Sequence, residues 1–226
     1  MTAEPLDPRT VSAYHRRLPY GERVSAESML GEPFFPFEGD VQVVRLADPL
    51  IPEPPRNGEP GGGDCYRCAN PDADVIWRDD RWDVRTGFEP IGLPMMAGLA
   101  PRQHMTLHAL TPEIVTSFGE VVQRLALAIG RIDGVARTHF SRWGDGSEHF
   151  HMWFLARPLG LMQLRGAMIA AWNCMLAPIP DEEFRANMVT VASAMAEAGG
   201  QAVGAGRVGG APSPHDAAAQ DDAQGR

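Results

Sequence analysis

Lysine is absent from this sequence of 226 residues, so all 20 of its basic residues are arginine. Lysine supplies the amine of Schiff-base enzymes and the phosphate-loop cation of Walker-type proteins, so aldolase-like, pyridoxal-phosphate and Walker-type mechanisms are excluded. The formal net charge is −9, so the chain lacks the basic field that attracts duplex nucleic acid. We therefore expect no bulk nucleic acid among its partners.

Long apolar runs are also missing. No stretch approaches the roughly 20 apolar residues of a membrane span, and residues 1–8 lack a basic region followed by a hydrophobic core. We therefore expect a cytoplasmic protein without a membrane partner.

Cysteine is scarce, with three residues in the whole chain. Two of them, Cys65 and Cys68, have C-x-x-C spacing. In a reducing compartment this spacing favours metal binding or redox chemistry over a structural disulfide. Zinc prefers a tetrahedron of Cys and His ligands, so two further ligands are needed.

Composition divides the chain into three parts. Residues 1–64 are rich in proline and glycine, which predicts an irregular N-terminal arm in which only residues 40–46 resemble a strand. Residues 65–198 carry the periodic apolar pattern of one folded domain with a C-terminal helix. Residues 199–226 have almost no large apolar side chain, so burial cannot offset the entropy of ordering them, and we expect a disordered tail.

Within the domain, alternation and turn residues predict short strands followed by a helix, a hairpin and a final helix. The expected strands cover residues 74–77, 82–85, 91–100, 135–143 and 148–156. The first helix begins at Pro112 after the N-cap Thr111 and ends near Asp133, and the last covers about 180–198. This order predicts an α+β domain.

Two histidines alternate in the last expected strand. Alternation would place His149, His151 and Trp153 on one face. Such a pair is a satisfied surface or core pair about half the time, so the surrounding sequence has to decide.

The segment 148–155 resembles the histidine-triad motif, His-x-His-x-His with apolar residues between, of nucleotide hydrolases and transferases. Residues 74–84 resemble the opening hairpin of that family, and 100–104 with 110–113 resemble its strand-to-helix junction. The resemblance implies an antiparallel sheet of about five strands with a helix packed on it. It also implies a partner that is a nucleotide or a nucleotide-sugar-like small molecule, and homodimerisation is possible.

The resemblance makes His151 the nucleophile that attacks the α-phosphorus, with its other ring nitrogen held by a backbone carbonyl. Gly146 and Ser147 would present a backbone N–H and a hydroxyl to phosphate oxygens, although an ordinary hairpin turn is an equal alternative. Arg142 would donate to phosphate, with a solvated strand-edge charge as its alternative. Trp153 replaces the last motif histidine in the expected substrate site and offers one donor and no acceptor.

The resemblance also completes a zinc site like that of galactose-1-phosphate uridylyltransferases and several bacterial histidine-triad proteins. It adds His104 and His149 to Cys65 and Cys68, with His108 as the rival to His104. Four protein ligands make a closed structural site. The alternative is an incidental C-x-x-C in a flexible arm.

Three functions follow from these patterns. The first is a hydrolase or nucleotidyltransferase that acts at an α-phosphate through His151. The second is a catalytically silent, zinc-stabilised nucleotide-binding or accessory protein, in which Trp153 has removed a polar group. The third is redox use of Cys65 and Cys68, which ranks last because no thioredoxin-like βαβ pattern surrounds them.

Overall fold

The structure is a computed structural model that describes residues 19–23, 35–37, 39–45, 47–87 and 89–203. Its centre is a six-stranded sheet in which every neighbouring pair is antiparallel and the strand order is β4-β5-β3-β2-β1-β6. The strands are β1 (Val75–Arg78), β2 (Trp82–Thr86), β3 (Met96–Pro101), β4 (Val135–Ser141), β5 (Met152–Pro158) and β6 (Gln201–Ala202). The helices are α2 (Tyr66–Ala69), α3 (Pro112–Ile129), α4 (Met168–Met175) and α5 (Asp181–Glu197), with 3-10 turns η3 (Leu107–Ala109) and η4 (Met162–Leu164).

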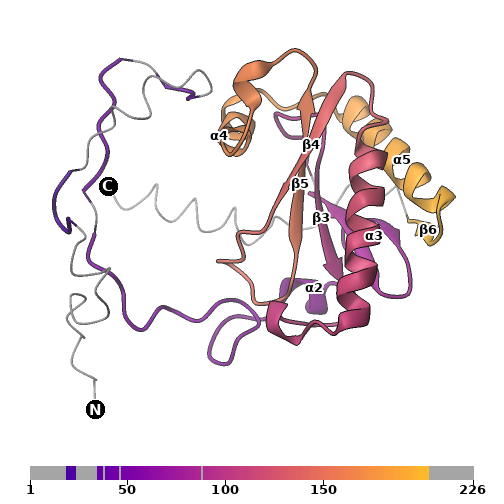
Figure 1. The fold of residues 1–226 in the computed structure, drawn as a ribbon, viewed down its shortest axis with the longest axis horizontal. Helices are drawn as coiled ribbons and strands as arrows, with labels where there is room; N and C mark the ends of the chain where they lie inside the picture. Colours follow the sequence, from indigo (N-terminus) through magenta and orange to yellow (C-terminus); the bar gives the residue numbers. More distant parts are fainter. Residues whose placement is uncertain (1–18, 24–34, 38, 46, 88, 204–226) are drawn as a thin grey trace.

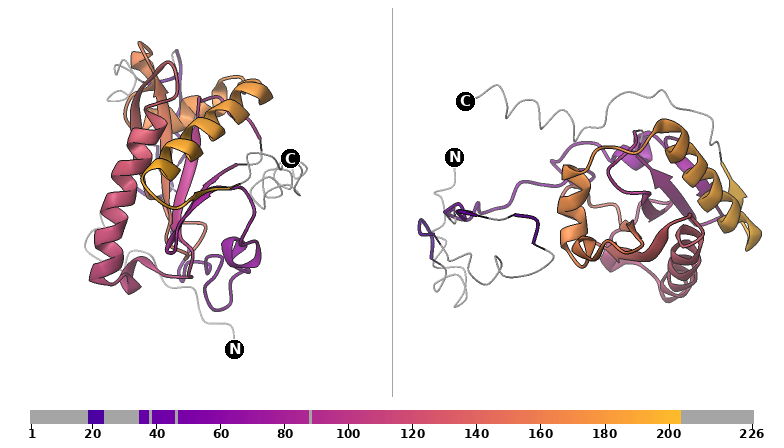
Figure 2. Two further views of the ribbon diagram at one scale, coloured as in Figure 1. Left: turned by 90° about the vertical axis from the view of Figure 1, so that its right-hand side faces the viewer. Right: turned by 90° about the horizontal axis from the view of Figure 1, so that it is seen from above.

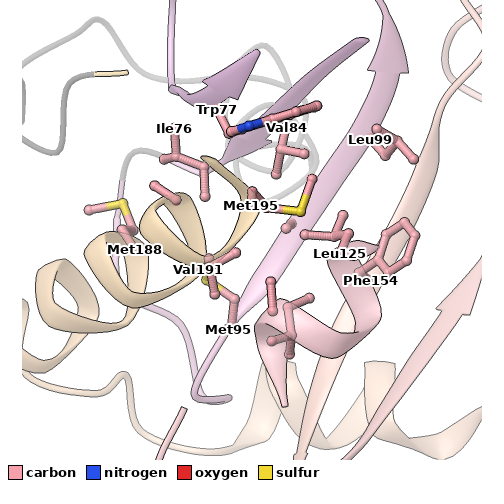
Figure 3. Close-up of a cluster of buried hydrophobic side chains, with 14 of the residues drawn as sticks. Ile76, Trp77, Val84, Met95, Leu99, Leu125, Phe154, Met188, Val191 and Met195 are labelled. Carbon is pink, nitrogen blue, oxygen red and sulfur yellow. The ribbon is translucent and has the colours of Figure 1, made fainter. Parts of the chain in front are cut away.

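One face of the sheet is covered by α3 and α5 (Figure 1). The hydroxyl of Thr111 accepts a hydrogen bond from the N–H of Ile114 and caps α3, as the Thr-Pro pattern predicts. Helix α5 presents Met188, Val191 and Met195 to the strands (Figure 3). Because these side chains recur at helical spacing, they form one apolar stripe that closes the main core.

The opposite face carries a smaller apolar cluster beneath α4. Leu155 packs there with Ile169 of α4, whereas the preceding strand residue, Phe154, belongs to the main core. This alternation places Trp153 and Leu155 on the face away from α3 and α5. The view from above shows α4 separated from α3 and α5 by the sheet (Figure 2), and α2 lies near the other end of the strands (Figure 1).

The α+β class and its antiparallel sheet are confirmed. The predicted hairpin forms β1 and β2, the helix that begins at Pro112 forms α3, and the last helix forms α5. Helix α3 ends at Ile129 with Gly130 as its C-cap, a few residues before the predicted end. In the described part of the chain, no helix combines the length and the apolar character that crossing a membrane requires.

Some predicted boundaries are wrong. The strand expected over 148–156 begins at Met152, and the strand expected over 91–100 begins at Met96. Residues 40–45 form no strand, because they pair with no neighbouring strand, and the carbonyl of Val43 accepts from the side chain of Arg23 instead. Leu46 lies outside the described residues. Segments 148–151 and 91–95 instead form connections outside the strands, although the carbonyl of Met95 still accepts from the N–H of Ala156 in β5.

The predicted start of the tail is also too early. Residues 201–202 form β6, which pairs with β1, and the N–H of Val203 donates to the carbonyl of Ile76. Residues 204–226, the rest of the predicted disordered tail, lie outside the described residues. Helix α4 and strand β6 were not predicted, so the sheet has one strand more than expected.

Candidate metal centre and adjoining histidine site

Four predicted ligands come together at one end of the sheet. Cys65 precedes α2 and Cys68 lies in it, His104 follows β3, and His149 precedes β5. One ligand atom from each lies within 4.8 Å of all the others. His108, the predicted rival of His104, lies in η3 and is not part of this cluster. The arrangement is compatible with a metal site.

The spacing of the donor atoms fits a tetrahedral ion. The Sγ atom of Cys65 is 3.4 Å from Nδ1 of His149, and the Sγ atom of Cys68 is 3.7 Å from the same nitrogen and 3.4 Å from Nδ1 of His104. Ordinary zinc–sulfur and zinc–nitrogen bonds in a tetrahedron place sulfur and nitrogen about 3.5 Å apart. The cluster therefore has the dimensions of a closed Cys2His2 site.

The two histidines turn the same ring nitrogen toward the sulfurs. His149 is 1% exposed, and its Nε2 lies 2.8 Å from the carbonyl oxygen of Pro101. The Nε2 of His104 lies 3.5 Å from Oε2 of Glu148. Each ring can thus donate from Nε2 and keep an Nδ1 lone pair for a cation, as outer contacts of metal-bound histidines commonly arrange.

Two residues of the cluster, His149 and Cys68, favour their neutral forms. Burial lowers the pKa of His149 to about 4, so the ring is neutral at pH 7. Burial and the neighbouring Cys65 raise the pKa of the Cys68 thiol to about 11, so cation binding must displace protons from sulfur.

Buried arginine fixes the metal-binding turn to the sheet. Arg85 of β2 donates to the carbonyl oxygens of Asn70 and Pro71, at 2.8 and 2.9 Å, directly after α2. Its charge is balanced by Asp83, whose carboxylate is 3.2 Å away. Arg78 of β1 also donates to Pro71. These bonds hold the segment after Cys65 and Cys68 against β1 and β2.

Residues that the sequence analysis assigned only to the irregular arm complete one wall of the cluster. The backbone N–H of Asn57 donates to the carbonyl of Gly146, and its carbonyl accepts from the N–H of Glu148. These two bonds form an isolated β-bridge between Asn57 and Ser147. A Cβ atom on Gly58 would lie 3.0 Å from Cε1 of His104 and 3.5 Å from Cβ of Cys65, and its φ of +93° also favours glycine. In the sequence, the Asn57-Gly58 dipeptide is the signal that indicates a turn at this position.

His151 adjoins the cluster and is only partly buried. Its Nδ1 lies 2.8 Å from the carbonyl oxygen of His149. Donation from Nδ1 leaves the lone pair on Nε2. Burial lowers the pKa of His151, and the guanidinium groups of Arg67 and Arg142 lower it further, although the bond to His149 acts against them. A neutral imidazole with one free nitrogen is therefore the favoured form.

Of the other predicted substrate residues, Trp153 and Arg142 act on His151, whereas Gly146 and Ser147 contact the arm. The guanidinium of Arg142 folds back beside Gly144, 6.0 Å from the ring centre of Phe150, and its Nε is buried without a hydrogen-bond partner among the described residues. Gly146 and Ser147 form a bridge with the arm in place of a tight hairpin turn. The Trp153 ring stands edge-on to His151, with ring centres 6.0 Å apart.

Fold and site together define an α+β sheet protein with a metal-compatible Cys2His2 cluster beside a neutral histidine. No family model and no curated protein matches the sequence. Among solved structures, a histidine triad protein from Marinobacter aquaeolei VT8 matches with 14% identity and a TM-score of 0.46, over 59% of this chain and 95% of that one.

Two further solved structures match at a similar level. A Zn-bound histidine triad family protein from Mycobacterium smegmatis matches with 20% identity and a TM-score of 0.41, over 59% of this chain and 94% of that one. A uridylyltransferase mutant matches with 16% identity and a TM-score of 0.42, over 59% of this chain and 48% of that one.

Proposed function

We propose that this chain is a histidine-triad-type hydrolase or nucleotidyltransferase that acts at the α-phosphate of a nucleotide conjugate. The observation that carries the proposal is the hydrogen bond between Nδ1 of His151 and the carbonyl of His149. It aims a nucleophilic Nε2 away from the backbone, as attack on phosphorus requires. The ligand would be a nucleotide or a nucleotide-sugar-like small molecule.

The proposed reaction has two displacements. Nε2 of His151 forms a bond to the α-phosphorus while the bond to the leaving oxygen breaks, and that oxygen departs with the electron pair and takes up a proton. Water then attacks the phosphorus in a hydrolase, or an acceptor phosphate or hydroxyl attacks it in a transferase, and the phosphorus–nitrogen bond breaks. The Nδ1–H bond to His149 supports the positive charge on the ring during the first step.

The substrate contacts follow from the surroundings of His151. Arg142 has a buried, unpartnered Nε, and a guanidinium can contact two phosphate oxygens at once. Gly146 and Ser147 lie on the connection that leads into the histidine segment. Trp153 would pack against the substrate and offer one N–H.

We further propose that Cys65, Cys68, His104 and His149 hold a zinc ion. Four protein ligands leave no open position, so the role is structural. The ion would fix the His149 backbone, and the His149 carbonyl in turn orients the His151 ring. Metal and nucleophile are thus coupled through one residue, without the metal touching the substrate.

The test compares His151→Ala with His108→Ala, which removes a histidine of the same chain that lies outside the cluster. Turnover is measured with adenylated and uridylylated model substrates, and metal content by mass spectrometry. We expect His151→Ala to lose turnover by about 10³-fold or more while it retains the metal, and His108→Ala to retain both. Equal turnover in His151→Ala and the parent would remove His151 from the mechanism.

One observation favours a second function, a silent nucleotide-binding or accessory protein. Trp153 stands on β5 at the third motif position, where it supplies no acceptor. If the parent is inactive and Trp153→His creates turnover, the silent function is favoured. If Trp153→His weakens an active parent, the tryptophan belongs to a working site of different design.

A further inference from the structure

Arg67 of α2, which lies between Cys65 and Cys68, reaches across the sheet face toward Trp153. Its Nη2 lies 2.9 Å from the point that a Cβ atom on Gly98 would occupy, and Cζ3 of Trp153 lies 3.5 Å from the same point. Gly98 is the residue of β3 that pairs with Trp153 of β5. The guanidinium and the indole therefore meet in the space that a missing side chain leaves open.

Glycine at position 98 is what permits this approach. A side chain there would collide with Nη2 of Arg67, and it would also contact the Trp153 ring. Strands disfavour glycine in their interiors, and its presence often marks a place where another group comes close. Here the approaching group is a cation from the metal-binding turn.

The cation lacks a counterpart of its own. Nη1 of Arg67 is buried and has no hydrogen-bond partner among the residues that the structure describes, and no carboxylate in that part of the chain forms an ion pair with it. Arg85 on the same face shows the contrast, because it is paired with Asp83 and donates to two carbonyls. A buried donor without a partner is costly unless a ligand satisfies it.

Arg67 also lies close to the histidine site. A guanidinium stays charged at neutral pH. The Trp153 ring, which approaches the same point above Gly98 as Arg67, stands 6.0 Å from the ring of His151. A charged, under-satisfied guanidinium thus lies near the proposed nucleophile.

We propose that Arg67 binds a phosphate group of the nucleotide and supplies the polar contact that Trp153 cannot. This inference rests on the proposed function, and it deepens that function by assigning an anion-binding residue to the same site. The planar fork of arginine fits two phosphate oxygens, and the nearby Trp153 ring limits the positions that the fork can take. Gly98 is the positioning residue that keeps the space open.

The experiment measures binding of inorganic phosphate, AMP and UMP to the metal-loaded protein by calorimetry, with adenosine as the uncharged comparison. Arg67→Met removes the charge at similar length, and Arg81→Met makes the same change at an exposed position in the β1–β2 turn. We expect Arg67→Met to weaken phosphate-bearing ligands by about 10- to 100-fold. Adenosine binding, metal content and the Arg81→Met variant should be unchanged.

Gly98→Ala provides an independent test, because it displaces the guanidinium without removing the charge. We expect it to weaken AMP and UMP by about 3- to 10-fold, half of the Arg67→Met effect on a logarithmic scale. Arg67→Lys should keep part of the affinity through its charge. If Arg67→Met does not fold, as shown by circular dichroism, these two variants decide the question.

Two results would overturn the assignment. One is unchanged AMP and UMP affinity in both Arg67→Met and Gly98→Ala. The other is a folded, metal-loaded parent that binds none of the three phosphate probes. The catalytic proposal fails separately, because His151→Ala can retain turnover while Arg67→Met still loses phosphate binding.

Discussion

His149 and His151, two residues apart, hydrogen-bond to backbone carbonyls through different ring nitrogens, so a different nitrogen of each ring keeps its lone pair. In His149 the Pro101 carbonyl takes Nε2, which leaves Nδ1 for the cysteine sulfurs. In His151 the Nδ1 atom hydrogen-bonds to the His149 carbonyl, which leaves the lone pair on Nε2. Burial lowers the pKa of both rings, so each is a lone-pair donor at neutral pH.

Asp74 gives a prediction for pH dependence at the same scale. Burial raises the pKa of this half-buried carboxyl to about 6, although Arg85 and Arg67 act in the other direction. The unfolded chain has a value of about 3.9, so the folded state holds the proton more tightly. The contribution of Asp74 to stability is therefore greatest below about pH 4 and falls as the pH rises through about 6.

We expect Asp74→Asn to stabilise the protein at pH 7 by about 1 kcal/mol, a value reduced from the full shift because the group is partly solvated. Asparagine also tolerates the φ of +58° at this position. Urea unfolding of parent and variant at pH 4 and pH 7 measures the difference, and the metal ligands are the same in both. A gain that is as large at pH 4 as at pH 7 would contradict the assigned cause.

At the level of elements, the packing of β6 beside β1 depends on a turn that admits glycine alone. Gly200 has a φ of +78°, and a Cβ atom there would lie 2.5 Å from the Trp77 ring and 2.6 Å from the Arg78 carbonyl oxygen. The same turn accepts a hydrogen bond from Nε1 of Trp77 through the Gly199 carbonyl, at 3.0 Å. The turn therefore closes the main core around a fully buried tryptophan.

We expect Gly200→Ala to lower the free energy of unfolding by about 3 kcal/mol, because backbone strain and collision add. Gly134→Ala is the matched control. It has a φ of +73° but open space around its Cβ position, so about 1 kcal/mol is expected. Chemical denaturation measures the free energy of unfolding of both variants. Equal losses would show that Trp77 and Arg78 move aside without an energetic penalty, which would contradict the prediction.

The elements that sequence could predict are those with their own local signal. Helix α3 has a capping threonine followed by proline, and α5 opens with three acidic residues in its first turn. Helix α4 has no side-chain cap, and β6 has two residues that are held by pairing with β1. Such elements form through tertiary contacts, which single-sequence patterns do not contain.

At the scale of the molecule, the cluster joins segments that are far apart in the chain. Cys65 and His149 are separated by 84 positions, and Cys68 and His104 by 36. The family resemblance predicted all four residues of this cluster, because C-x-x-C, the histidine motif and the strand-to-helix junction that contains His104 are local patterns. The approach of Arg67 to Gly98 has no such pattern, since it depends on strand register and on where α2 packs.

A metal held by ligands from three separate segments should stabilise the whole fold, because those ligands come together only in the native state. Binding to the native state alone adds RT ln(1 + [L]/Kd), about 4 kcal/mol at a thousandfold excess over Kd. For a chain of this size, that corresponds to a loss of about 10 °C in Tm when a chelator removes the ion. Calorimetry with and without EDTA measures the loss, and added zinc should reverse it.

The variants His104→Ala and His108→Ala separate this linkage from general damage. His108→Ala should respond to EDTA as the parent does, since His108 lies outside the cluster. His104→Ala should start from a lower Tm and respond little, because a ligand has already been lost. If a metal-containing parent has the same Tm after chelation, the ion does not hold the three segments together, and the proposed structural role is wrong.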